Sequence, residues 1–329
     1  MKRVRIYGTL GPACREPAVL KEMLAAGMDG MRLNLSHATL AESEPLLEAY
    51  RKAADACGAH PALLIDLMGP ELRIGTLDSP ILLRSGDRIA ADALPFPETV
   101  RSALTRVPIG QEILLDDGKI LLKTDGEHLL RVVRGGALES RKSVALPGLS
   151  PDAPALTEAD QNHIRIAKSY GVTAVMQPFV RKKEDLIAVR TALNEAGAAD
   201  LRLFAKIENA DGIAHLDELI PCCDEIVVAR GDLGNAMPLW KLPAVQKRIA
   251  AACRDAGKDF TVVTQMLDSM THRPVPTRAE VSDVFNAVLD GASSVMLTGE
   301  TASGDYPVEA IRYLVNTVRE AEAYRDARL

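Results

Sequence analysis

Short strand-like runs alternate with amphipathic helical stretches along most of this chain, and no other property of the sequence restricts the fold as strongly. This pattern is typical of parallel βαβ units. Eight such units predict an α/β fold, a closed (β/α)₈ TIM barrel, which needs ~250 residues. The predicted strands are Val4–Thr9, Gly30–Asn34, Ala62–Leu67, Ala174–Pro178, Leu203–Ile207, Glu225–Ala229, Thr261–Gln265 and Ser294–Thr298. The predicted helices include Ala18–Ala26, Leu46–Cys57, Glu158–Tyr170, Glu184–Ala196, Pro243–Ala256 and Val308–Ala323.

The stretch from Ile74 to Leu146 interrupts this alternation. Within it, the alternating runs Glu112–Leu115 and Lys119–Lys123 flank the dipeptide Asp117-Gly118, which predicts a β-hairpin with a primed turn. We therefore expect a small β-rich lid domain inserted after the third strand, at the strand end where barrels of this kind carry their active sites. The predicted organisation is barrel for residues 1–73, lid for 74–146 and barrel again for 147–329.

Composition narrows the class of protein. The chain is 47% hydrophobic and 26% charged, with 4% aromatic residues and a net charge of −6, which disfavours nucleic acid as a partner. No apolar run approaches the ~18 residues of a membrane span, and Met1-Lys2-Arg3 leads into a strand. We expect no membrane partner and a cytoplasmic location. The five cysteines lack CxxC spacing, which favours mostly buried free thiols over a metal or redox role.

Polar side chains stand at the carboxyl end of almost every predicted strand. In a barrel these ends converge on one mouth, where carboxylates suit a hard cation, fixed cations suit phosphate and hydroxyls suit proton transfer. Such a set favours phosphoryl transfer over hydride or acyl transfer, and neither a Gly-x-Gly-x-x-Gly nor a Gly-x-Ser-x-Gly motif is present to support those two activities. The residues are Thr9, Arg32, Asn34, Ser36, Asp66, Lys206, Glu208, Arg230, Asp232, Thr264, Thr298 and Glu300.

Eight segments, in this order along the chain, resemble those of the pyruvate kinase family. They are GPACREPAVLKEMLAAGMDGMRLNLSH, GPELRIG, DDGKI, LPGLSPDAPALTEAD, AKIENADGI, VARGDLG, TQMLDSM and PTRAEVSDVFNAVLDGASSVMLTGETASGDYP. The resemblance covers nearly the whole predicted barrel. It implies phosphoryl transfer between phosphoenolpyruvate and a nucleoside diphosphate such as ADP, giving pyruvate and a nucleoside triphosphate such as ATP, in glycolysis.

The resemblance also implies roles for residues on the fifth and sixth strands. Lys206 and Glu208 point to the same side because strand side chains alternate with a period of two. Lys206 resembles the lysine that stabilises charge on the moving phosphoryl group, and Glu208 and Asp232 resemble the ligands of Mg²⁺ or Mn²⁺. The backbone at Gly231 and Asp232 is expected to hold the substrate carboxylate. The alternative is a Lys–Glu surface pair with a separate capping aspartate.

Other substrate contacts follow from the same resemblance. Arg32 resembles the arginine that grips the phosphoryl group, and Thr264 the threonine near the enolate face that receives a proton, through water. Thr298 stands where a serine is common and keeps the hydroxyl, close to the site with Glu300. As alternatives, Thr264 is a strand-end cap and Glu300 a buried structural acid.

Ions and the nucleotide are assigned in the same way. The potassium ligands of the family fall at Asn34, Ser36, Asp66 and the carbonyl of Leu67, and Glu71 matches members that require potassium. The nucleotide contacts fall at Arg73, His37, Asn34, Lys142 and Asp116, although His37 also suits a structural role.

This sequence departs from the family in several places. It ends at Leu329, just after the eighth barrel helix, so we expect no C-terminal regulatory domain and no sugar-bisphosphate activation, and the barrel shape suggests a homodimer. The lid is short for the family. Leu67-Met68 stands where the family has Thr-Lys, and Gln177-Pro178 where Ala-Ser is common. Two alternatives stay open: a magnesium-dependent aldolase, lyase or other kinase acting on another 2-oxo acid or enol phosphate, and a non-catalytic regulatory relative.

Overall fold

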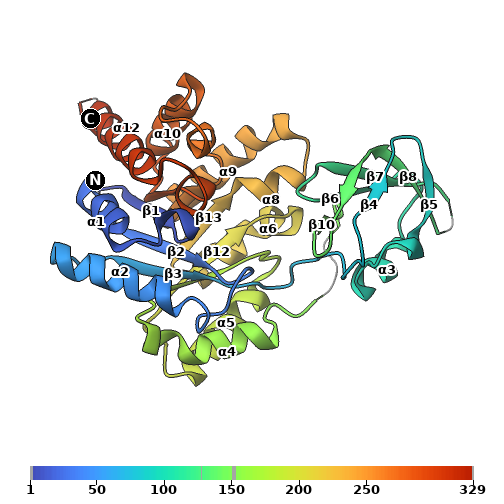
Figure 1. The fold of residues 1–329 in the computed structure, drawn as a ribbon, viewed down its shortest axis with the longest axis horizontal. Coiled ribbons are helices and arrows are strands. Elements are labelled where there is room, and N and C mark those ends of the chain that lie inside the picture. The colour runs from blue at the N-terminus through green and yellow to red at the C-terminus, as the bar shows by residue number, and fades with distance from the viewer. Residues whose placement is uncertain (1–2, 127, 150–152, 328–329) are drawn as a thin grey trace.

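A computed structural model describes residues 3–126, 128–149 and 153–327. Its centre is a closed barrel of eight parallel strands in the order β1-β15-β14-β13-β12-β11-β3-β2, which confirms the predicted fold class (Figure 1). Met1, Lys2 and residues 150–152, within the segment LPGLSPDAPALTEAD, lie outside the described residues. The barrel strands are β1 (Arg5–Thr9), β2 (Gly30–Asn34), β3 (Ala62–Asp66), β11 (Ala174–Gln177), β12 (Arg202–Ile207), β13 (Glu225–Ala229), β14 (Asp259–Val263) and β15 (Ser294–Met296).

Most predicted strands agree with these bounds to within one residue, but the seventh does not. It was expected to run to Gln265 and instead ends at Val263, because Thr264 and Gln265 have φ angles of 77° and 53°, which no strand accommodates. The eighth also ends two residues early, at Met296, because Thr298 leaves the extended conformation to begin the short helix α11 (Gly299–Ala302).

Helices cover the outside of the barrel. They begin and end at residues that suit helix termini. Pro17 opens α1 and Gly27, with φ 114°, closes it, while Thr277 and Glu280 form a capping box at the start of α10. The helices after each barrel strand are α1 (Pro17–Ala26), α2 (Glu44–Cys57), α4 (Glu158–Ile166), α5 (Lys183–Glu195), α6 (Ala210–Ala214), α7 (Leu216–Leu219), α8 (Arg230–Asn235), α9 (Leu242–Asp255), α10 (Arg278–Leu289) and α12 (Pro307–Asp326).

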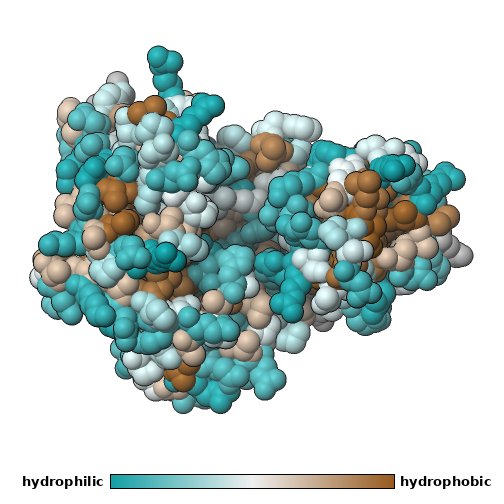
Figure 2. Space-filling model, viewed as in Figure 1, coloured by the Kyte–Doolittle hydropathy of each residue, from teal (hydrophilic) through white to brown (hydrophobic). Residues whose placement is uncertain are grey.

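A second unit separates β3 from α4. It holds a five-stranded antiparallel sheet in the order β10-β6-β7-β8-β5, a two-stranded sheet β4-β9 and the helix α3 (Glu98–Leu104), which the sequence did not reveal. Figure 2 shows this unit as a smaller lobe beside the barrel. Its strands are β4 (Ile81–Leu83), β5 (Arg88–Ala90), β6 (Glu112–Leu115), β7 (Ile120–Thr124), β8 (Leu129–Arg134), β9 (Gly136–Leu138) and β10 (Val144–Ala145).

The predicted hairpin of this lid is confirmed. Leu115 pairs with Ile120, and the amide of Lys119 donates to the carbonyl of Asp116 at 3.0 Å. Asp117 and Gly118 occupy the two central turn positions with φ angles of 54° and 79°, as a primed turn requires. The domain limits at 73/74 and 146/147 stay predictions.

Two further expectations concern the chain as a whole. Among the residues that the structure describes, no helix is both long enough and apolar enough to cross a membrane. The five cysteines are free; Cys14, Cys223 and Cys253 are buried as expected, whereas Cys57 at the end of α2 is exposed. Its position in an apolar run therefore did not predict its burial.

Candidate active site

A chain of ion pairs crosses the mouth of the barrel from β2 to β12. Arg32 Nε lies 2.7 Å from Asp66 Oδ2, which lies 3.0 Å from Lys206 Nζ, and Lys206 Nζ lies 3.0 Å from Glu208 Oε1. The side chains of Asp66 and Glu208 are 1% exposed, and those of Arg32 and Lys206 13% and 12%. The ends of three barrel strands thus bring two cations and two carboxylates into one nearly water-free row.

Charge partners keep the middle of this row ionised. Burial alone would lower the pKa of Lys206, but Asp66 and Glu208 outweigh it and raise that pKa above its usual value. Burial alone would raise the pKa of Asp66, but Lys206 and Arg32 outweigh it and lower that pKa. The ammonium of Lys206 is therefore a permanent positive charge at the mouth.

The two carboxylate oxygens of Glu208 differ in their hydrogen bonding. Its Oε2 accepts a hydrogen bond of 2.8 Å from the amide of Phe179. Its Oε1 is buried and forms an ion pair with Lys206. The geometry of this pair does not meet the criteria of a hydrogen bond, and no other described group donates a hydrogen bond to Oε1. Such an orphaned carboxylate oxygen suits a cation.

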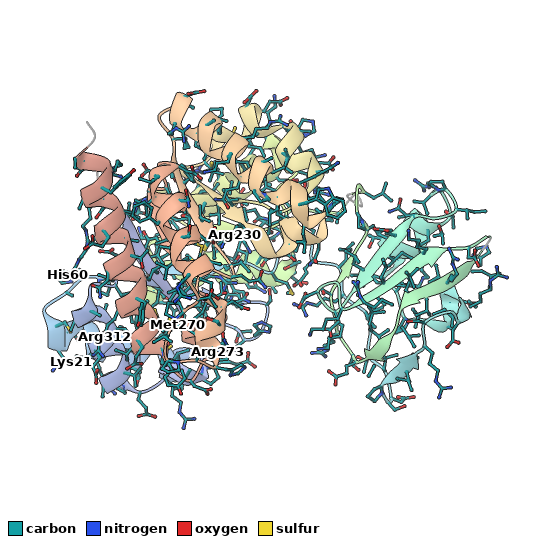
Figure 3. The ribbon with its side chains drawn as sticks, turned by 90° about the horizontal axis from the view of Figure 1, so that it is seen from above. Lys21, His60, Arg230, Met270, Arg273 and Arg312 are labelled. Atoms are coloured by element: carbon teal, nitrogen blue, oxygen red, sulfur yellow. The ribbon has the colours of Figure 1, made fainter. Side chains whose placement is uncertain are left out.

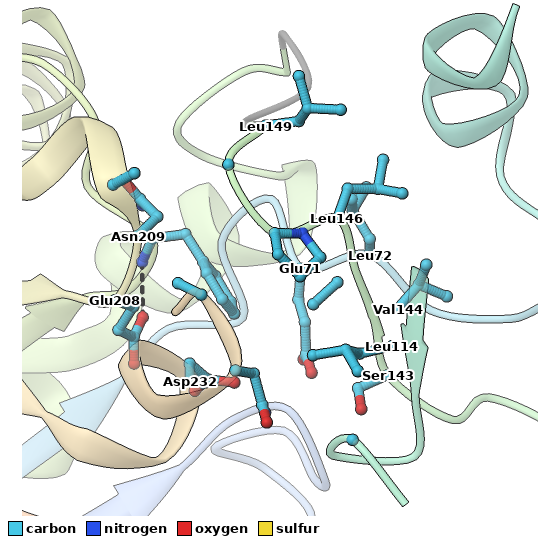
Figure 4. A pocket seen from close by; sticks show the side chains of 18 of the residues that line it. Glu71, Leu72, Leu114, Ser143, Val144, Leu146, Leu149, Glu208, Asn209 and Asp232 are labelled. Atoms are coloured by element: carbon cyan, nitrogen blue, oxygen red, sulfur yellow. Dashed lines mark hydrogen bonds between the residues drawn. The ribbon is translucent and has the colours of Figure 1, made fainter. Parts of the chain in front are cut away.

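Asp232, in the first turn of α8, is the second carboxylate of the pair. Burial raises its pKa against the pull of Lys206, and Glu71 and Asp117 raise it further. Burial likewise raises the pKa of Glu208 to about 7, with Asp232 adding to the rise. Figure 4 shows Glu71 and Asp232 directed toward the same space between lid and barrel.

These carboxylates fit a divalent cation that keeps open positions. No group of three or more His, Cys, Asp or Glu side chains in the described parts of the chain forms a complete metal cage. Mg²⁺ is commonly held by one or two protein carboxylates, with water and substrate oxygens filling the remaining positions. Glu208 and Asp232 match that requirement.

Thr264 lies at the same mouth, on a strained turn. Its φ of 77° is unusual for a β-branched residue. A Cβ built on Gly231 would lie 3.1 Å from Thr264 Cγ2 and 3.6 Å from its Oγ1. The Thr264 side chain therefore lies against Gly231, which the sequence analysis assigned to the substrate carboxylate.

The predicted potassium ligands cluster around the ends of β2 and β3. Asn34 Oδ1 accepts a 3.2 Å hydrogen bond from the amide of Ser36, and the carbonyl of Asp66 accepts one of 2.9 Å from Leu35. The carboxylate of Asp66 already carries Arg32 and Lys206. A monovalent ion here would share that carboxylate, and Leu67 itself is buried.

The predicted nucleotide contacts fall into two groups. Arg73 pairs with Glu71 at 2.8 Å, and partial burial together with the charges of Arg73 and Arg32 lowers the pKa of His37. The positive charge of Arg73 therefore reaches His37. Asp116 and Lys142 instead pair with each other at 3.1 Å inside the lid.

Two clefts open at the mouth. The first lies between lid and barrel and includes Glu71, Phe179, Glu208 and Asp232; the second lies beside β1 and β2. Asp117, at the tip of the lid hairpin, lines both, whereas Asp116 lines neither. The second cleft includes Thr9, Arg32, Asn34, His37 and Thr298.

Two polar side chains at the mouth form hydrogen bonds to the backbone of neighbouring loops. Glu300 is 1% exposed, and its carboxylate accepts hydrogen bonds from the amides of Leu267 at 3.0 Å and Thr298 at 2.8 Å. These contacts favour the structural alternative for Glu300. The departure Gln177 is also buried, with Nε2 donating to the carbonyl of Ala155 at 2.8 Å, so it joins neighbouring loops of the barrel.

Sequence reasoning missed two groups. Asp117 was interpreted as a turn residue, and in a pair of adjacent aspartates nothing local tells which one faces the cleft. The amide of Phe179, which donates to Glu208 Oε2, was not considered, and Phe179 itself has a φ of 53°. A backbone donor on a positive-φ residue leaves no signal in the side-chain pattern.

Comparisons with known proteins give one consistent result. A family model for the pyruvate kinase barrel domain matches residues 1–311. The human protein named pyruvate kinase PKLR is 41% identical over 342 residues, covering 97% of this chain and 59% of that protein. Pyruvate kinases of Geobacillus stearothermophilus and Bacillus licheniformis are 38% and 37% identical, covering 94% and 98% of this chain. The chain spans only 55% and 57% of the length of those two relatives.

Proposed function

Because this chain belongs to the pyruvate kinase family, we propose that it moves a phosphoryl group between phosphoenolpyruvate and a nucleoside diphosphate, giving pyruvate and a nucleoside triphosphate. The observation that carries the proposal is the buried row Arg32–Asp66–Lys206–Glu208. Phosphoryl transfer needs positioned charge more than covalent help from the protein, and this row supplies that charge at a place from which water is largely excluded.

Each end of the row has its own role in this proposal. Arg32 and Lys206 bind and orient the phosphoryl oxygens, and Asp66 holds both cations in place from below. Glu208 and Asp232 would hold Mg²⁺ or Mn²⁺, and Asn34, Ser36, Asp66 and the Leu67 carbonyl would hold K⁺, with Glu71 nearby. These ions would neutralise charge on the phosphate and enolate oxygens while bound.

The remaining residues orient the rest of the substrates. The backbone at Gly231 and Asp232 binds the carboxylate of phosphoenolpyruvate, and Thr298 contacts the substrate from the second cleft. Thr264 moves a proton, through water, to the carbon that becomes the methyl group of pyruvate. The nucleotide lies on the side of Arg73, His37 and Asn34, with Lys142 approaching it from the lid and Asp116 holding Lys142 through their ion pair.

The test is pyruvate formation from phosphoenolpyruvate with a panel of nucleoside diphosphates, with Mg²⁺ and either K⁺ or tetramethylammonium. We expect turnover that depends on Mg²⁺ and falls severely in tetramethylammonium, because that cation is too large for the site at Asn34 and Asp66. Pyruvate formation with no response to K⁺ would remove the potassium assignment alone.

Absence of turnover with every nucleotide would contradict the proposal. Calorimetry then separates the two alternatives. Mg²⁺-dependent binding of pyruvate or another 2-oxo acid would favour a lyase or a different kinase, and no Mg²⁺-dependent binding would favour a regulatory relative.

A further inference from the structure

The turn after β14 is strained at the residue to which we assign proton transfer. Thr264 and Gln265 have φ angles of 77° and 53°. Left-handed backbone is uncommon outside glycine, and for a β-branched residue it is an outlier. Such a conformation persists only where the surrounding structure holds it.

One guanidinium holds both strained residues. Arg230 Nε and Nη2 donate to the carbonyl of Thr264 at 3.2 and 2.8 Å, and Nη2 also donates to the carbonyl of Gln265 at 3.1 Å. In an extended strand, consecutive carbonyls point in opposite directions. The carbonyls of Thr264 and Gln265 can meet one guanidinium only because the backbone turns at these residues. The planar fork of arginine is suited to such a contact.

The guanidinium is itself anchored from the outside of the barrel. Arg230 Nη1 donates to Asp283 Oδ2 on α10 at 2.6 Å, and the Arg230 side chain is only 11% exposed. All three nitrogens of Arg230 therefore have acceptors within the protein. Figure 3 shows Arg230 within the barrel, away from the lid.

Arg230 and the turn at Thr264 both adjoin Gly231, at the mouth of the barrel. Gly231 follows Arg230 directly, and the Thr264 side chain lies over Gly231, where a Cβ would come within 3.1 Å of Thr264 Cγ2. Arg230 thus fixes the turn that holds the Thr264 side chain against Gly231.

We infer that Arg230, anchored by Asp283, is a positioning residue that fixes the direction of the Thr264 hydroxyl at the site. This inference rests on the proposed function. Arg230 acts through Thr264 and does not touch the substrate, since its donors are directed at Thr264, Gln265, Met266 and Asp283.

The variant Arg230→Lys tests this role. Lysine keeps the charge, but one ammonium does not span two carbonyls and a carboxylate in the fixed geometry of the guanidinium. We expect kcat to fall about a hundredfold, the loss typical of a catalytic group displaced by ~1 Å. The KM for phosphoenolpyruvate should stay close to the wild-type value, because the binding groups Arg32 and Lys206 are untouched.

Two further variants serve as partner and control. Asp283→Asn removes the anchor charge and is expected to lower kcat in the same direction by a smaller factor. Arg273→Lys makes the same substitution at an exposed arginine and is expected to leave kcat unchanged. Thermal unfolding of all three variants separates a loss of folded protein from a loss of turnover.

A partial reaction isolates the proton step. In D₂O, pyruvate bound to the enzyme loses a methyl proton through the Thr264 relay. The electron pair of the broken C–H bond forms the enolate, and a deuteron from the solvent then adds to the same carbon. No co-reactant is consumed, and nuclear magnetic resonance follows the loss of the methyl signal. Arg230→Lys should slow this exchange as much as it lowers kcat, while Arg273→Lys should not.

A crystal structure of Arg230→Lys gives a readout that needs no activity. The inference expects the φ angles of Thr264 and Gln265 to leave the positive range in the variant and to keep it in the wild type. Positive φ angles retained in Arg230→Lys, or kcat and exchange equal to those of Arg273→Lys, would overturn the inference. An inactive wild-type protein would instead contradict the proposed function, and the φ angles of the two proteins would still decide the role of Arg230.

Discussion

Lys206 is the residue on which the charges of the site depend. It lies between Asp66 and Glu208, and both carboxylates are buried. Asp66 keeps Arg32 as a second partner when Lys206 is removed, whereas Glu208 keeps only the amide of Phe179 among the contacts described above. A change at Lys206 therefore affects the protonation of Glu208 as well as the phosphoryl group.

We predict that Lys206→Met lowers turnover at least a hundredfold, as removal of one positioned group that stabilises developing charge typically does. The fold should survive, because Glu208 can take up a proton and become neutral. Turnover and the thermal unfolding midpoint are the measurements. Lys168→Met, which breaks an exposed pair with Asp200, is the matched control. A variant that kept most of its turnover would refute the assigned role.

The raised pKa of Glu208 allows us to predict how metal binding depends on pH. Burial raises its pKa to about 7, so without a metal it is largely protonated below that pH. A proton and a divalent cation compete for the same carboxylate, and lowering the pH from 7 to 6 should weaken binding about fivefold. Mn²⁺ titrations followed by electron paramagnetic resonance measure this. Equal affinity from pH 5.5 to 8, or binding unchanged in Glu208→Gln, would contradict it.

The opposite ends of the strands carry a second buried charge cluster, centred on β13. Glu225 Oε2 lies 2.8 Å from Arg5 Nη2 and 2.9 Å from Arg202 Nη2, while its Oε1 accepts hydrogen bonds from Thr261 and Ser294 at 2.6 and 2.7 Å. These residues belong to five strands of the barrel. The cluster ties the amino ends of the strands together, far from the chemistry.

We predict that Glu225→Ala reduces the free energy of unfolding by about 2 kcal/mol, because the buried hydroxyls of Thr261 and Ser294 lose their acceptor and Arg5 and Arg202 keep only Asp259 as a carboxylate partner. Denaturant unfolding measures this loss. Turnover per folded molecule should not change, since the mouth keeps its own ion pairs. Glu309→Ala, which removes a half-exposed carboxylate in the first turn of α12, is the control. A fall in turnover without a fall in stability would show that the two ends of the barrel are coupled.

The residues that the structure describes form three hydrophobic clusters, two in the barrel and one in the lid, and the smaller barrel cluster lies inside the ring of strands. The larger barrel cluster fills the space between the barrel strands and their helices, and the lid cluster lies wholly between Ile74 and Leu146. The chain enters and leaves the lid side by side, because the amide of Val144 donates to the carbonyl of Leu72 at 2.8 Å. Each unit therefore buries its own apolar surface.

We predict that the barrel folds without the lid. Arg73 and Ser143 are antiparallel partners, so two glycines can join them as a hairpin turn. This variant should keep a cooperative thermal transition and helical circular dichroism, and should lose turnover because one wall of the cleft is gone. The intact chain under the same conditions is the reference. Loss of cooperative unfolding would show that the barrel needs the lid to fold.

Patterns that repeat along the chain are determined by the sequence alone. The alternation of strands and helices predicted the barrel, and Asp117-Gly118 predicted the hairpin turn, because burial of alternating faces and positive φ angles both restrict residue type locally. The polar residues at the strand ends could be predicted from the same alternation, since the parallel strands of a barrel must end at one mouth.

Contacts between distant segments were decided only by the folded structure. Strand β14 ends before Thr264 and Gln265, whose carbonyls accept hydrogen bonds from Arg230, more than thirty residues away. Likewise Glu300 bonds the loop after β14, and Asp117 rather than Asp116 faces the clefts. Local residue preferences carry no information about which partner a side chain meets across the barrel, because that is set when all eight strands close together.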